Sequence, residues 1–417
     1  MRKRRSRSGS RAFSGFSARV AARIALFGLL GAGLAYLAFA NAFSNVTHRG
    51  NPRLALRFTP DDPVALTGLA AIRIARDQNL RDPAITALAR QSLTELAINP
   101  AALRLIGLMA SADGGLPAGR RAMLLADRMS RRDTATQLWL IEEAVARNDI
   151  PGALQRYDNA LRVAGETQQV LFPVLTAALE DPQISDSFIP YIREPTPWLG
   201  DFVRHAVRNS RRPAAYAALF MRAGGLPRDP VFASLEQELI KRLIDTDASA
   251  TAARYYGSLQ GADRRVLRSA AFSDRSVDTR FVPLTWEIFT LPGLNAAFVR
   301  SGSDALALQG LVEAGGATPV ARKVVLVPAG TYRFRARQGL IGQGGTAEAT
   351  WQLLCSGGNS AQPVWSRTDP LVAQRRAVEA SLNVPARCYT PMLRLLVTAT
   401  GSSAEFTIQS VSLEPAA

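Results

Sequence analysis

The chain has 417 residues, with 50 Lys and Arg against 34 Asp and Glu and a formal net charge of +16 at pH 7. Eight of the positive charges precede residue 24, and segments 44–270 and 271–417 carry net charges of only +5 and +3. Nucleic-acid-binding domains concentrate Lys and Arg on their folded surface, so this distribution argues against nucleic acid as a partner.

One uncharged stretch, Ile24–Phe43, is long and apolar enough to cross a membrane. Its 20 residues would rise about 30 Å as a helix, which matches the hydrocarbon layer of a bilayer. The basic leader 1–23 carries eight Lys and Arg residues, whereas segment 44–60 carries three. Positive flanks are retained in the cytoplasm, so we expect a cytoplasmic amino terminus and about 370 residues on the opposite side.

A cleaved signal peptide is the alternative, because Ala40–Ala42 forms an A-x-A site before Phe43. The apolar run is longer than the about 7 to 15 residues of a signal peptide, which favours a permanent anchor. Gly28 and Ala32 stand one helical turn apart, as a helix-pairing face requires. They suggest a homodimer formed through the span.

Segment 44–60 is expected to be a connector, since it contains the breakers Asn51, Pro52 and Pro60. From residue 61, apolar residues recur with helical spacing and are interrupted at regular intervals. The interruptions are 37, 33 and 34 residues apart, a period typical of paired-helix repeats. They fall at Asp62-Pro63, Asn99-Pro100, Arg132-Asp133 and Glu166-Thr167.

The third helix pair has the clearest packing pattern, with Ala153, Tyr157 and Ala160 spaced as A-x3-Y-x2-A. Small residues let two helices approach, and the aromatic ring fills the groove between them. Residues 60–180 therefore resemble tetratricopeptide repeats, although the usual first-helix aromatic and glycine positions and the closing proline are mostly missing. This resemblance implies a concave surface that binds protein segments.

The run 181–195, with Pro182, Pro190 and Pro195, is expected to interrupt the helices before helical patterning resumes. We interpret 61–270 as one irregular α-solenoid that either binds protein partners or holds the last domain away from the membrane.

Segment 271–417 changes to a two-residue period, with at least eight short alternating stretches separated by Gly, Ser, Asn and Pro. Many strands without intervening helices predict an antiparallel β-sandwich. The stretches are 281–291, 304–312, 324–327, 331–337, 349–355, 377–384, 392–397 and 404–413. In this order they resemble the jelly-roll sandwiches of carbohydrate-binding modules, a resemblance that implies glycan binding.

Sugar rings stack on exposed aromatic side chains, and five aromatics are available for this role. Trp351 and Trp286 are expected in the core, and Trp365 is the preferred surface candidate because it lies in a loop-rich run. The others are Tyr332 and Tyr389.

Arg333, Arg335 and Arg337 alternate with apolar residues and should share the outer face of one strand. They form either an ordinary solvated face or a patch for an acidic polysaccharide. Cys355 and Cys388 lie on strands of this same domain, and outside the cytoplasm they are expected to form a disulfide.

Catalytic signatures are missing from the sequence. It contains no G-x-S-x-G, no Gly-Lys-Ser/Thr phosphate loop and no H-E-x-x-H. Two cysteines without C-x-x-C spacing and two histidines do not suggest a metal site. We therefore expect a chain without catalytic residues, cofactor or metal.

The combination of anchor, helical repeats and sandwich resembles uncharacterised envelope proteins of Gram-negative bacteria, some of them associated with exopolysaccharide production. The resemblance implies an inner-membrane adaptor whose periplasmic repeats bind protein and whose sandwich binds glycan or protein. The alternatives are a cell-wall or division scaffold that binds protein only, and a glycan-processing hydrolase.

Overall fold

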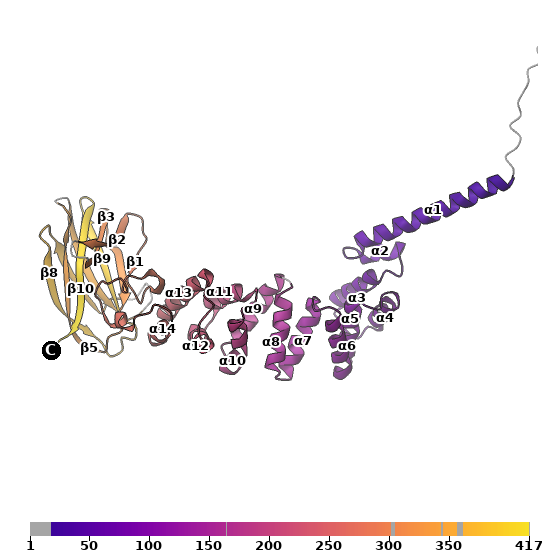
Figure 1. Ribbon diagram of the computed structural model, residues 1–417, viewed down its shortest axis with the longest axis horizontal. Coiled ribbons are helices and arrows are strands. Elements are labelled where there is room, and N and C mark those ends of the chain that lie inside the picture. The colour runs from indigo at the N-terminus through magenta and orange to yellow at the C-terminus, as the bar shows by residue number, and fades with distance from the viewer. Residues whose placement is uncertain (1–17, 164, 302–304, 343–344, 357–361, 417) are drawn as a thin grey trace, which may run out of the picture. The chain divides into compact units, whose positions relative to one another are not determined.

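The computed structural model describes residues 18–163, 165–301, 305–342, 345–356 and 362–416 (Figure 1). The chain forms two compact units, Met1–Val163 and Ala164–Ala417, which are described separately. Residues 1–17 of the predicted basic leader lie outside the described residues.

The first unit begins with α1 (Ala18–Thr47), whose stretch Leu26–Thr47 is long and apolar enough to cross a membrane. The predicted connector 44–60 is instead largely helical, because it contains the end of α1 and the helix α2 (Pro52–Phe58). Asn51 caps α2 by accepting a hydrogen bond from the Leu54 N–H, and Pro52 is its first residue. Asn51 and Pro52, predicted as breakers, therefore start a helix.

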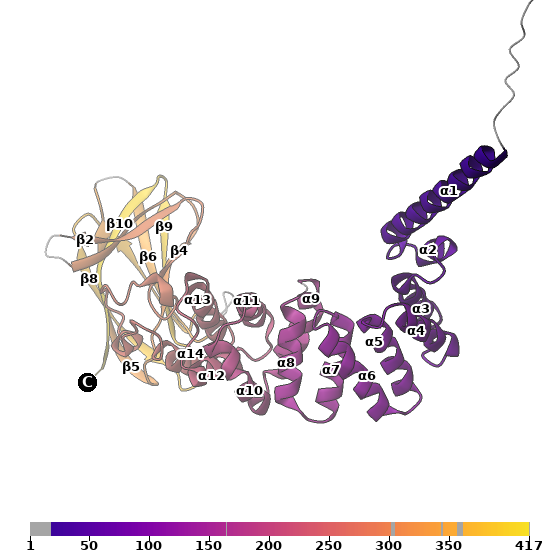
Figure 2. The same ribbon diagram turned by 45° about the vertical axis from the view of Figure 1, so that its right-hand side comes forward.

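Three helix pairs follow, and each helix packs against its partner in the pair (Figure 2). All four predicted interruptions coincide with the start of a helix. Ala153, Tyr157 and Ala160 are buried on α8, which packs against α7. The pairs are α3 (Pro63–Asp77) with α4 (Pro83–Glu95), α5 (Pro100–Ala112) with α6 (Leu116–Met129), and α7 (Thr134–Ala146) with α8 (Ile150–Leu161).

The second unit starts with six more helices, and one of them corrects the expected interruption at 181–195. Asp181 caps α10, Pro182 is its first residue, and Pro190 lies inside the helix. Proline at the first position has no N–H to lose, so this sequence begins a helix. The helices are α9 (Glu166–Ala178), α10 (Pro182–Arg193), α11 (Leu199–Asn209), α12 (Pro213–Ala223), α13 (Pro230–Asp245) and α14 (Ser249–Tyr256).

Two antiparallel five-stranded sheets form the predicted sandwich in the described part of the chain. The sheet orders are β1-β4-β9-β6-β7, called sheet A, and β2-β3-β10-β5-β8, called sheet B. The strands are β1 (Glu287–Ile288), β2 (Leu294–Ser301), β3 (Ala305–Val312), β4 (Thr318–Val324), β5 (Gly330–Leu340), β6 (Thr346–Leu354), β7 (Trp365–Leu371), β8 (Arg376–Val384), β9 (Met392–Thr400) and β10 (Ala404–Pro415).

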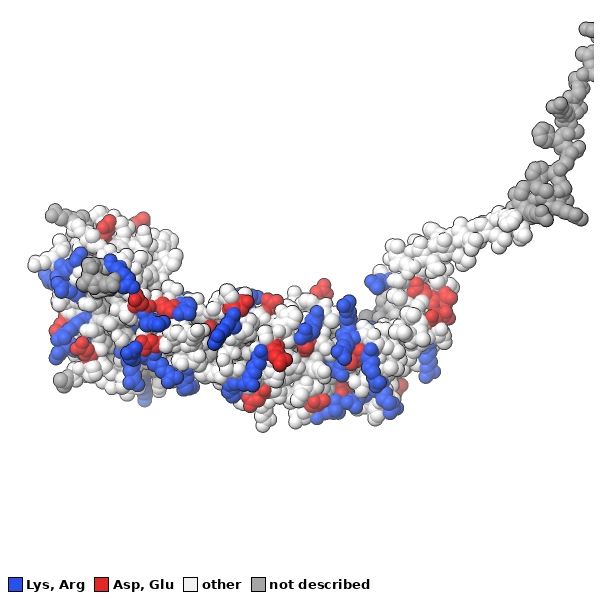
Figure 3. Space-filling view, in the orientation of Figure 1, with Lys and Arg blue, Asp and Glu red and all other residues white. Residues whose placement is uncertain are grey.

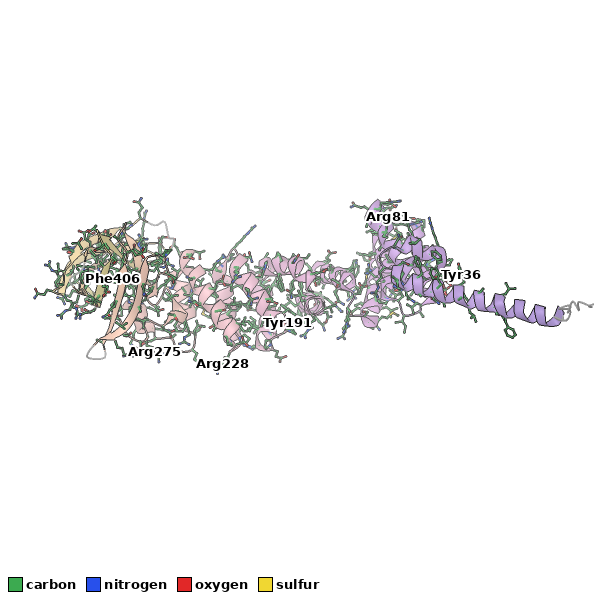
Figure 4. All side chains as sticks on the ribbon, turned by 90° about the horizontal axis from the view of Figure 1, so that it is seen from above. Tyr36, Arg81, Tyr191, Arg228, Arg275 and Phe406 are labelled. Atoms are coloured by element: carbon green, nitrogen blue, oxygen red, sulfur yellow. A yellow bond between two sulfur atoms is a disulfide. The ribbon has the colours of Figure 1, made fainter. Side chains whose placement is uncertain are left out.

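The sandwich core contains the large aromatics Trp286, Trp351 and Phe406, each at most 1% exposed (Figure 4 labels Phe406). The indole N–H of Trp351 donates to the Gln338 side chain, and that of Trp286 donates to the carbonyl of Ala270. Both tryptophans are therefore core residues, as the sequence predicts.

The boundary expected at 270/271 falls in a segment without regular strands that packs onto sheet A. Its two short 3-10 helices are η1 (Arg264–Arg268) and η2 (Thr279–Phe281). The fully buried Lys323 of β4 donates from Nζ to the carbonyls of Val266 and Leu284, at 3.0 and 2.6 Å. One side chain thus joins both ends of this segment to the sheet.

Candidate functional site

The three predicted arginines lie on the outer face of β5, and all three are exposed. Glu379 on β8 forms ion pairs with both Arg333 and Arg335, each at 3.1 Å, and Glu414 lies 3.8 Å from Arg335. Cross-strand acids therefore neutralise much of the patch. Arg337 has no such ion pair among the described residues, so it is the most available cation on this face.

Trp365, the preferred surface candidate, is half-buried at the start of β7. Its ring packs against the core residue Phe334, with ring centroids 5.3 Å apart, and its indole N–H donates to the carbonyl of Ser381 at 3.0 Å. The ring thus joins the edges of the two sheets instead of presenting an open face.

Tyr389 is the most exposed aromatic among the described residues of the sandwich. It is 70% exposed, whereas Tyr332 is buried. The preceding residue, Cys388, forms a disulfide with Cys355 at the end of β6, and the Tyr389 carbonyl accepts a hydrogen bond from the Ser249 hydroxyl of α14. The backbone that carries Tyr389 is thus held from two sides, which lowers the entropic cost of ordering this loop on binding.

Part of the outer face of sheet A is occupied by a polar junction with α13. Glu287 of β1 pairs with Lys241 of α13 at 2.9 Å and with Arg322 of β4 at 2.6 Å. Although burial acts to raise it, the pKa of Glu287 stays below its usual value because Lys241 and Arg322 donate to the carboxylate. This network joins the helices to the sandwich and leaves less of sheet A open to a ligand.

A polar pocket of about 370 Å³ lies among the α12–α13 turn, α13, the end of α14 and η2. Arg228 (labelled in Figure 4), Gln260 and Arg280 contribute to its lining, together with Glu236. Burial raises the pKa of Glu236 to about 7, and the nearby charge of Arg280 opposes this shift. Glu236 makes no ion pair or hydrogen bond within the described part of the chain, so its carboxyl is free for a ligand.

Replacing Glu236 by glutamine is expected to stabilise the protein at pH 8 by about 1–2 kcal/mol, allowing for partial exposure. Between about pH 4.5 and 7 the folded chain holds a proton that the unfolded chain has released, so this group's contribution to stability falls as pH rises. At pH 5 the variant should match the wild type. Chemical denaturation at both pH values measures the difference.

Glu238→Gln is the matched control, because Glu238 lies two residues away and pairs with Arg208 at 2.9 Å. Removing that surface pair should give no gain at either pH. If Glu236→Gln changed the free energy of unfolding equally at pH 5 and 8, the raised pKa of Glu236 would be contradicted.

An apolar groove of about 740 Å³ lies between α6 and α7 in the first unit. Leu116, Leu124 and Trp139 line it, and Arg121 and Glu142 are among the charged residues beside them. On the face shown in Figure 3, acidic and basic side chains are interspersed over the helices. A groove with an apolar floor and mixed charges suits a peptide segment with an apolar anchor.

No protein-family model and no curated protein matches this chain. Among solved structures, the similar ones include a CBM4 module (10% identity, TM-score 0.25) that aligns with 32% of this chain and 88% of its own. The CBM22-1 xylan-binding domain of Xyn10C from Paenibacillus barcinonensis (14%, 0.23) aligns with 32% of this chain and 87% of its own. TmCBM61, solved with β-1,4-galactotriose (12%, 0.22), aligns with 31% of this chain and 88% of its own.

Proposed function

We propose that this chain is a non-enzymatic, inner-membrane-anchored adaptor of the cell envelope, with a cytoplasmic amino terminus. Its periplasmic helical repeats bind protein partners of polysaccharide assembly or export, and its sandwich binds glycan. The observation that carries the anchor is the exposure of apolar side chains along α1: Phe27, Leu29 and Leu34 are 70%, 74% and 67% exposed. Such a helix is unfavourable in water and stable in a bilayer.

The packing of the A-x-A site supports retention of the anchor over cleavage. Ala40 and Ala42 lie inside α1, and Ala40 is only 4% exposed, because α1 packs there against α2. Proteases act on exposed, flexible backbone, which this helix does not offer. The Cys355–Cys388 disulfide supports a periplasmic sandwich, since disulfides persist in oxidising compartments.

Tyr389 is the aromatic that we propose for stacking on a sugar ring, with Arg337 as a cation for an acidic polysaccharide. Tyr389→Ala in the full-length protein is expected to weaken glycan binding about two- to tenfold, because a stacked aromatic contributes about 0.5–1.5 kcal/mol. Glycan arrays followed by titration of the bound glycan measure the effect.

Tyr389→Trp keeps an aromatic face and is the control that should retain binding. Trp365→Phe tests the other candidate and should leave affinity unchanged. Equal glycan affinity of Tyr389→Ala and the wild type would overturn the assignment of Tyr389.

A scaffold that binds protein only is the second candidate, and the ion pairs of Arg333 and Arg335 with Glu379 favour it. Absence of any glycan ligand, together with crosslinking of native membranes to protein partners at the α6–α7 groove, would support this alternative. The same crosslinking experiment reports a homodimer through the face of Gly28 and Ala32.

A further inference from the structure

The last turns of α1 are part of the first folded unit. The ring of Phe58 on α2 lies 4.8 Å from that of Phe43 and 6.1 Å from that of Phe39, between centroids. Ala40 and Ser44 are 4% and 1% exposed. The membrane helix therefore enters the folded unit without a flexible linker.

Polar contacts join the end of α1 to the start of α3. The Asp62 carboxylate accepts a hydrogen bond from the Ser44 hydroxyl and lies 3.3 Å from Nδ1 of His48. Its second oxygen caps α3 by accepting from the N–H groups of Val64 and Ala65, each at 2.9 Å. The end of α1 and the start of α3 thus share one carboxylate and move together.

The length of the span then fixes the depth of α2. A hydrocarbon layer of about 30 Å needs about 20 helical residues, and counted from Ile24, the first residue after Arg23, these end at Phe43. If the layer ended before Phe39, only the 15 residues from Ile24 to Ala38 would remain, and these rise about 22 Å. A layer that starts at Ile24 therefore ends beside Phe39 and Phe43, and Phe58 lies there with them.

Three basic side chains on and beside α2 suit this position, and they outnumber the exposed carboxylates nearby, Asp61 and Asp77. Arg49, Arg53 and Arg57 are all exposed, and none of them forms an ion pair within 4 Å among the described residues. Arginine stems can lie along the apolar boundary while their guanidinium groups bind lipid phosphate.

We propose that α2 lies in the headgroup layer of the bilayer, with Phe58 at the hydrocarbon boundary and Arg49, Arg53 and Arg57 bound to anionic phospholipid headgroups. The first helix pair is then seated on the membrane surface. This inference rests on the proposed membrane anchor and adds a second contact with the bilayer.

Depth measurements on the full-length protein in nanodiscs test the proposal. Because Leu56 on α2 is half-buried in the protein, a spin label at Leu56→Cys is expected to be protected from an aqueous nickel chelate but still reached by oxygen, which concentrates in the bilayer. The same label at Val145→Cys, which replaces a 58% exposed residue of α7, should be freely accessible. If both positions were equally accessible in protein that stays in the membrane fraction after carbonate washing, the headgroup position of α2 would be wrong and the membrane anchor would stand. Release by carbonate would overturn the anchor.

Lipid composition supplies the second comparison. Protection at residue 56 should be stronger in phosphatidylcholine with 30% phosphatidylglycerol than in phosphatidylcholine alone. Replacing Arg49, Arg53 and Arg57 by glutamine should remove this difference, with about a fivefold effect on docking per arginine. A difference that survives the triple replacement, or crosslinks between protomers at residue 56 that account for the protection, would contradict lipid binding by these arginines.

Discussion

Replacing both Cys355 and Cys388 by alanine is expected to lower the free energy of unfolding of the second unit by about 3–4 kcal/mol. The disulfide joins residues 33 apart in sequence, and closing a loop of this length restricts the unfolded chain by about that amount. For a unit of this size, the midpoint of thermal unfolding should fall by roughly 10 °C. Near-ultraviolet circular dichroism of the full-length protein measures the change.

Reductant supplies the control. Wild-type protein in excess reductant should unfold at the midpoint of the double variant, and reductant should not change the variant itself. An unchanged midpoint in the variant would show that the β6 end and the Tyr389 loop are held without the disulfide. Glycan affinity of the folded variant should also fall, because Tyr389 follows Cys388 directly and its loop would be less ordered.

The helical region could be predicted well because the local signals agree with the fold. The Asp62-Pro63 and Asn99-Pro100 steps are each an N-cap followed by a proline in the first helical position. The Asn51-Pro52 and Asp181-Pro182 steps carry the same signal and also start helices, although the sequence pattern predicts a break at each. Proline alone does not show whether a helix ends before it or begins with it.

Sequence alternation misses β2 and β7, which lie at the edges of their sheets, and it places the interior strand β4 too late, since the predicted stretch 324–327 shares only Val324 with it. An edge strand buries less of its surface, so selection on its pattern of apolar residues is weaker. Trp365 begins β7, and this explains why its surroundings resemble a loop.

Alternation along β5 correctly places three arginines on an outer face, but it contains no information on the strand beside them. Glu379 reaches two of these arginines only because β5 and β8 pair in this register. The pocket beside Glu236 could not be predicted from the sequence either, because its lining residues, from Gly224 to Phe281, come from four separate elements. Such sites depend on tertiary contacts that no local pattern encodes.

Replacing Lys323 by methionine is expected to change how stability depends on pH. Burial lowers the pKa of Lys323 to about 7, against an ordinary value of 10.5, while its carbonyl acceptors favour the charged form. Between these pH values the unfolded chain binds one proton more than the folded chain. The free energy of unfolding should therefore rise with pH in the wild type, by about 1.4 kcal/mol per pH unit from this group, and the variant lacks this slope.

At pH 7 the lysine keeps most of its burial penalty, which amounts to about 4 kcal/mol, and by pH 10 this penalty has largely disappeared because the unfolded chain is also losing the proton. The methionine variant leaves the carbonyls of Val266 and Leu284 without this donor, a cost of about 1–3 kcal/mol that is independent of pH. We therefore expect the variant to be at least as stable as the wild type at pH 7 and clearly less stable at pH 10.

Denaturant titrations of both proteins from pH 6.5 to 10 measure the difference in their free energies of unfolding. The contributions of all other titrating groups are the same in both proteins and cancel. Leu393→Met is the packing control, because Leu393 pairs with Lys323 across the β4–β9 register and does not titrate. Its curve should run parallel to the wild type. Parallel curves for Lys323→Met would mean that the carbonyls of Val266, Leu284 and Val324 keep the ammonium charged throughout. The segment between the helices and the sandwich would then be held by a buried cation.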